Sequence, residues 1–232
     1  MVGGRAVFVV VMGVVASGCG GSVSAPTDAN TLTTAYSGVF AGPLDDSGVI
    51  DFVVTKPTAT EPQGSLTGTL LLEPTRGPIP LIGAVDASGQ SARFSGSVPG
   101  QAGTLSCNGD LSTDTFFGTC VGEDFSIHDF GAAAGTTIRY CGSAMSNGLL
   151  NIAWNLFSAG RVAGGVYTNG AVQGIIHGTR AGADMSLELT PSGSATGHVS
   201  GSNVTGTWTI TYLDGHLPPD NGTFSASTDN CP

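Results

Sequence analysis

Positive charge is scarce in this sequence. Its 232 residues include seven Lys or Arg against 17 Asp or Glu, which gives a formal net charge of −10. Lys56 is the only lysine. Surfaces that bind nucleic acid neutralise phosphates with clusters of Lys and Arg, so this composition argues against DNA or RNA as a partner.

The sequence also lacks the local motifs of the common enzyme classes. It has no G-x-S-x-G elbow, no P-loop, no H-E-x-x-H pair and no dinucleotide-binding glycine fingerprint. The histidines do not have the spacing of metal ligands, and we expect neither a metal nor a cofactor. Each histidine is predicted to be a solvated or rim residue; they are His128, His177, His198 and His216.

A single short apolar run stands near the N-terminus. It follows Arg5, covers residues 6–16, and is too short to span a bilayer. The motif at its end, Ala16-Ser17-Gly18-Cys19, resembles the lipobox of bacterial lipoproteins, although that family prefers Leu, Val or Ile where Ala16 stands. The resemblance implies that residues 1–18 are a signal peptide and that Cys19 carries lipid such as palmitate.

The lipid would hold the protein to a membrane through a tether. Residues 19–34 contain the lipidated Cys19 and a small, polar stretch with too little apolar bulk to form a core. Two or more acyl chains are enough for stable anchoring. Gly20 stands where inner-membrane members of this family carry Asp, so the resemblance implies the outer membrane or the cell surface.

Four cysteines remain besides Cys19, and an even number in an exported protein indicates disulfides. The stretch 107–120, CNGDLSTDTFFGTC, predicts a hairpin with its two-residue turn at Thr113-Asp114. Cys107 then faces Cys120, and directly opposed residues of antiparallel strands lie close enough for a disulfide. The remaining pair is Cys141–Cys231.

Most of the chain after the tether has the pattern of antiparallel sheet. Short runs alternate between apolar and polar residues, as in 184–190. The chain also repeats itself, because Tyr36-Ser37-Gly38 matches Tyr140-Cys141-Gly142 and residues 117–120 match 205–208. The second half contains eight candidate strands and the first half seven or eight.

We therefore predict an all-β fold of two tandem eight-stranded meander barrels, over residues 35–132 and 136–232. The alternative is one larger barrel or sandwich built from both halves. Gly206-Thr207-Trp208 resembles the G-x-W signature of the calycins, the lipocalins and avidins, whose members bind small molecules in the barrel mouth. In calycins the signature lies in the first strand, whereas here it lies in the next-to-last candidate strand, so no binding residue is carried over.

These patterns favour a lipid-anchored envelope protein without catalytic activity, which serves envelope structure, surface display or contact with another protein. The alternative function is binding of a small apolar ligand inside a barrel. Its predicted lining residues are Trp154, Trp208, Ile210 and Tyr212. The same side chains could instead fill a small barrel. An envelope or extracellular hydrolase is the second alternative.

Overall fold

The computed structural model describes residues 33–41, 47–72, 77–97, 103–123, 126–146, 151–168, 173–211 and 219–232. The predicted signal peptide, Cys19 and most of the tether lie outside the described residues. Across the described ranges, no helix is long and apolar enough to cross a membrane.

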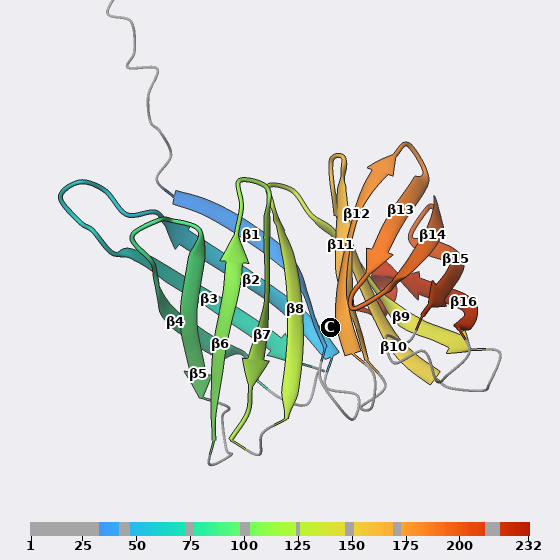
Figure 1. Ribbon diagram of the computed structural model, residues 1–232, viewed down its shortest axis with the longest axis horizontal. Coiled ribbons are helices and arrows are strands. Elements are labelled where there is room, and N and C mark those ends of the chain that lie inside the picture. The colour runs from blue at the N-terminus through green and yellow to red at the C-terminus, as the bar shows by residue number, and fades with distance from the viewer. Residues whose placement is uncertain are drawn as a thin grey trace, which may run out of the picture. The chain divides into compact units, whose positions relative to one another are not determined.

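The described strands close into two antiparallel barrels (Figure 1). In each barrel, strands that follow one another in sequence are paired, and the last strand pairs with the first. The prediction of two tandem eight-stranded meanders is therefore confirmed, and one larger barrel or sandwich is excluded. Closure pairs every strand on both sides, which removes the free sheet edges that promote aggregation.

The strands of the first barrel are β1 (Thr33–Ala41), β2 (Ser47–Thr55), β3 (Gly64–Leu72), β4 (Ile79–Val85), β5 (Ser91–Ser97), β6 (Thr104–Leu111), β7 (Thr115–Val121) and β8 (Ile127–Ala134). The strands of the second barrel are β9 (Ile138–Ser146), β10 (Asn151–Ala159), β11 (Val162–Thr168), β12 (Gln173–Ala181), β13 (Asp184–Leu189), β14 (Gly193–Ser200), β15 (Asn203–Ile210) and β16 (Asp220–Ser227). A short 3-10 helix, η1 (Thr228–Asn230), follows β16.

Alternating side chains build the barrel interiors. In β13, Met185, Leu187 and Leu189 are buried and the residues between them are exposed. Successive side chains of a strand point to opposite faces, so one face of each strand fills the core. Four phenylalanines meet in the first barrel with ring centroids 4.8–5.9 Å apart; they are Phe52, Phe94, Phe116 and Phe130.

A pair of glycines makes room for one of these rings. Gly109 on β6 faces Gly118 on β7, and Gly118 in turn faces Phe130 on β8. A Cβ atom added at Gly118 would lie 2.7 Å from Cε1 of Phe130. Real carbon contacts are longer, at about 3.5–4.0 Å, so the Phe130 ring occupies the space that a side chain at Gly118 would need.

The second barrel repeats this arrangement at equivalent strands. Gly197 on β14 faces Gly206 on β15, and Gly206 faces Phe224 on β16. A Cβ atom at Gly206 would lie 2.5 Å from Cε1 of Phe224. The sequence repeat between residues 117–120 and 205–208 thus falls on the seventh strand of each barrel and on the same packing contact.

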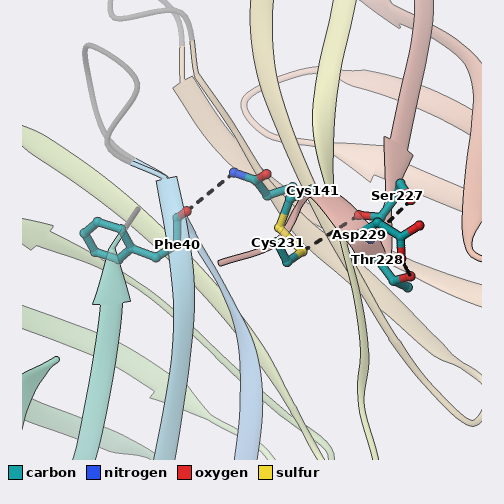
Figure 2. Close-up of a disulfide and its surroundings, with 7 residues drawn as sticks. Phe40, Cys141, Ser227, Thr228, Asp229 and Cys231 are labelled. Atoms are coloured by element: carbon teal, nitrogen blue, oxygen red, sulfur yellow. Dashed lines mark hydrogen bonds between the residues drawn. A yellow bond between two sulfur atoms is a disulfide. The ribbon is translucent and has the colours of Figure 1, made fainter. Parts of the chain in front are cut away.

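Two disulfides join cysteines of the same barrel, in the pairs that the hairpin register predicts. Cys107 and Cys120 are directly opposed on β6 and β7 and are buried inside the first barrel. Cys141 on β9 is bonded to Cys231, just beyond η1, and so ties the C-terminal segment to the barrel wall (Figure 2). In the loop-entropy account such bridges contribute about 3 kcal/mol for a short loop and nearer 5 kcal/mol for a long one.

The two barrels contact each other through an apolar cluster on their outer faces. Its buried members come from both barrels; they are Val39, Ala41, Phe117, Ala133, Phe157 and Val166. Polar contacts flank the cluster. The Asn155 amide donates a hydrogen bond to the Phe40 carbonyl at 3.5 Å, and Arg139 forms an ion pair with Asp51.

Replacing Gly118 with alanine should destabilise the first barrel. The added Cβ would lie 2.1 Å from the Asn108 carbonyl oxygen as well as against Phe130, so backbone and ring must both move. Overpacking of this kind costs about 1–3 kcal/mol. Urea unfolding should show this loss for Gly118→Ala and almost none for Gly77→Ala, because nothing lies within 4 Å of a Cβ at Gly77. Equal stability of the two variants would contradict the packing role of Gly118.

Candidate functional site

The predicted ligand-lining residues lie in the interior of the second barrel, except for Tyr212, which is outside the described residues. Trp154, Trp208 and Ile210 are 0%, 2% and 4% exposed. The Trp154 ring centroid lies 4.9 Å from that of Phe224 and 6.4 Å from that of Trp208. These residues therefore pack against each other and fill much of the barrel, as expected for eight strands.

Both indole nitrogens of this cluster are unusual. The Nε1 atoms of Trp154 and Trp208 are buried, and neither has a hydrogen-bond acceptor among the described residues. Buried donors are nearly always paired, because an unpaired one costs about 1–3 kcal/mol. The second barrel thus presents two N–H groups that could each donate to an acceptor atom of a small guest.

His216 lies outside the described residues, and one of the other three histidines contradicts the prediction of a solvated or rim position. His128 lies on β8, is 6% exposed, and stacks on Phe40 with ring centroids 5.3 Å apart. Its neighbour Asp129 is also buried, on the opposite face of the strand. β8 is buried on both faces because its inner face lines the first barrel and its outer face is covered by the second barrel. His128 is on the inner face together with Phe130 and Ala132, so alternation along the strand already indicates its burial. Asp129 is on the outer face, and the pattern of one strand gives no signal that the second barrel covers it.

His198 pairs with the carboxylate of Asp184, a residue that is distant from it in the sequence. Its Nδ1 lies 2.8 Å from Oδ1 of Asp184, which is directly opposite on β13. The two side chains are 63% and 78% exposed. Exposed pairs of this kind contribute little stability, about 0–1 kcal/mol, and the histidine remains solvated as predicted.

A groove of about 620 Å³ lies where β5, β6 and β7 of the first barrel meet β12 of the second. We call it the inter-barrel groove, and its lining includes Arg93, Asn108, Asp110, Thr119, Ile175 and His177. No local motif marks it, because its two walls come from segments more than 50 residues apart in the chain. Sequence reasoning missed the groove for that reason.

Phe117 forms the base of the groove and holds its walls in place. Its ring points out of the first barrel and lies 4.2 Å, between centroids, from the His177 ring and 5.9 Å from that of Phe157. A Cβ added at Gly131 would approach a ring carbon of Phe117 to 2.6 Å, and one at Gly164 to 3.0 Å. A glycine from each barrel therefore lets the ring fit between them.

Polar side chains cross the first-barrel wall of the groove in register. Arg93 faces Asn108, Asn108 faces Thr119, and Thr119 faces Asp129. The Thr119 hydroxyl donates to Oδ1 of Asp129 at 3.0 Å. Asp110 lies two residues from Asn108 on the same face of β6, so all three groove strands present polar groups to the same space.

Burial changes the titration of two residues at this contact. His177 is an exposed residue of β12, as predicted for a rim position, but partial desolvation of its ring lowers its pKa below the ordinary value, while Glu188, directly opposite on β13, acts in the other direction. Burial raises the pKa of Asp129, and the hydrogen bond from Thr119 partly offsets this rise. His177 is therefore neutral at neutral pH.

In the part of the chain that the structure describes, no group of three or more His, Cys, Asp or Glu side chains is placed to hold a metal ion.

Comparisons with protein-family models and with curated proteins found no match. Among solved structures, the chain is similar to a candidate outer membrane protein from Bacteroides fragilis, at 11% identity over 85% of this chain and 97% of that one, with a TM-score of 0.27. It is also similar to the agglutinin of Burkholderia oklahomensis, at 11% identity over 83% and 95% of the chains, with a TM-score of 0.24. Intact Ap-TbpB, with N and C lobes, matches at 8% identity over 84% and 76%, with a TM-score of 0.29. At such low TM-scores, these likenesses carry no argument about function.

Replacing Asp129 with asparagine should stabilise the protein at pH 7 but not at pH 3. The raised pKa means that the folded state holds the Asp129 proton more tightly than the unfolded state, whose pKa is near 3.8. Stability is therefore lost as the pH rises from about 3.8 through the folded-state pKa. The amide of the Asp129→Asn variant would never ionise, and its oxygen could still accept from Thr119.

Urea unfolding at both pH values measures this difference. Glu61→Gln, at an exposed carboxylate, is the control and should change stability by less than about 0.5 kcal/mol at either pH. A destabilised Asp129→Asn protein at pH 7 would show instead that the carboxylate is needed as a charge.

Proposed function

We propose that this protein is a lipid-anchored component of a bacterial cell envelope, at the outer membrane or the cell surface, and that its double barrel is a non-catalytic module for display or contact. The observation that carries the proposal is that each barrel interior is filled by the protein's own apolar side chains. Such a body leaves its outer faces as the surfaces available for recognition.

The N-terminal sequence supports the anchoring half of the proposal. The lipobox-like Ala16-Ser17-Gly18-Cys19 supplies one thiol for lipid, and the first described strand begins only at Thr33. The segment between them is long enough to separate the barrels from a membrane surface. Two disulfides fit an oxidising compartment outside the cytoplasm.

Cys19 should be the site of lipid attachment. When the full chain is expressed in bacteria with an alkyne analogue of palmitate, the wild-type protein should be labelled and should sediment with membranes. Cys19→Ala should lose both the label and the sedimentation. The double variant Cys107→Ala/Cys120→Ala should keep both, because those cysteines are bonded inside the first barrel. A labelled Cys19→Ala protein would refute lipidation at this residue.

Binding of a small, mostly apolar ligand is the second candidate function, because the second barrel contains the two indole N–H groups of Trp154 and Trp208. An apolar guest with one or two acceptor oxygens would satisfy both donors, but it would have to displace part of the side-chain packing that fills this barrel. Trp154→Phe and Trp208→Phe remove each N–H and keep an aromatic ring.

Native mass spectrometry of the protein purified from its own membrane tests this second function. A bound ligand should add mass in the native spectrum, lose it on denaturation, and be largely lost in the double variant Trp154→Phe/Trp208→Phe. Thr67→Ala, on the outer face of β3, is the control and should keep the added mass. A wild-type native mass equal to that of the lipidated chain would rule the ligand out.

A further inference from the structure

The inter-barrel groove has the size and position of a ligand site. Its volume of about 620 Å³ lies within the range of about 300–1,000 Å³ that is usual for such sites, which form preferentially between domains. Its walls are held by the Phe117 contact between the barrels, so they need little ordering when a ligand enters.

The lining of the groove provides hydrogen-bond donors and acceptors side by side. The Arg93 guanidinium only donates, the Asp110 carboxylate only accepts, and the Asn108 amide does both. Arg93 faces Asn108 directly, and Asp110 follows two residues along the same face of β6. Adjacent hydroxyl groups, each of which donates and accepts, match this pattern.

The charge of the groove selects against ions. Among the lining residues, Arg93 and Asp110 carry opposite charges, and His177 is neutral at neutral pH. An anionic ligand would be attracted to Arg93 but repelled by Asp110. A cationic ligand would be attracted to Asp110 but repelled by Arg93. The groove therefore fits a neutral polar molecule better than a charged one.

The base of the groove supplies an apolar contact between the polar walls. Ile175 is partly exposed there and packs against the apolar cluster that contains Phe117. A molecule with hydroxyl groups around its rim and C–H groups on its faces can pack on this base and bond to the walls. Sugar rings have this distribution of polar and apolar surface.

An extended peptide cannot bind at this site by adding a strand to a sheet. All sixteen described strands are paired on both sides, so neither barrel offers the free edge that an extended peptide would join. Recognition must therefore rely on side chains.

We propose that the inter-barrel groove binds a neutral oligosaccharide. Arg93 and Asn108 donate hydrogen bonds to its hydroxyl groups, and Asp110 accepts hydrogen bonds from them. This inference does not depend on the lipid anchor or on the interior of the second barrel. If the double barrel is a module for display or contact, the groove is the surface through which it would bind a saccharide partner.

An array of immobilised saccharides tests the proposal with the full-length protein in a zwitterionic, sugar-free detergent. The array holds neutral oligosaccharides of two to six hexose or N-acetylhexosamine units, together with sialylated and sulfated saccharides. The wild-type protein should bind at least one neutral oligosaccharide. Asp110→Asn and Asn108→Ala should each weaken that binding about tenfold, the effect expected for losing a hydrogen bond of a charged or well-placed polar group.

Both substitutions are at exposed positions, so the variants should fold as the wild type does. Glu61→Gln is the matched control, because it removes an exposed carboxylate outside the groove lining and should leave binding unchanged. The NMR resonances of the His177 ring should shift on binding, since this ring lines the opposite wall.

Three outcomes would overturn the proposal. They are binding to no saccharide, binding only to sialylated or sulfated saccharides, and binding that Asp110→Asn and Asn108→Ala leave unchanged. The second outcome would indicate an anion site at Arg93, and the third a saccharide site elsewhere on the protein.

Discussion

The close approach of a phenylalanine ring to a pair of facing glycines is the constraint on which both barrels depend. An eight-stranded barrel encloses only enough space for its own side chains, so a bulky ring needs small residues beside it. Phe130 and Phe224 each lie over a glycine of the preceding strand, and a second glycine faces that one. The same packing in both halves accounts for these four strand glycines, Gly109, Gly118, Gly197 and Gly206.

A related contact on the outside joins the barrels. Phe117 follows Phe116 on β7, and because strand residues alternate, Phe116 enters the core while Phe117 points outward. Gly131 and Gly164 leave room for the outward ring. This single side chain therefore sets the spacing of β7 and β12, and with it the groove between them.

The closed barrels and the groove between them have different structural roles. The barrel interiors and the two disulfides stabilise the fold, and closure of each sheet leaves no unpaired edge strand in the described barrels. The recognition that we propose would therefore use outward side chains, whose replacement leaves the core packing unchanged. We propose that a lipid attached at Cys19 holds this body at the outer surface of an envelope.

The sequence by itself determined the features that depend on short-range pattern. Alternation along each strand, the turn at Thr113-Asp114 and the resulting register of Cys107 and Cys120 all follow from neighbouring residues. Only the tertiary structure decided which outer faces are covered. Asp129 is buried because the second barrel covers the outer face of β8, and the groove exists because β12 packs beside β7 and β8. Contacts between faces of separate barrels join residues far apart in the chain, and the pattern of one strand holds no information about them.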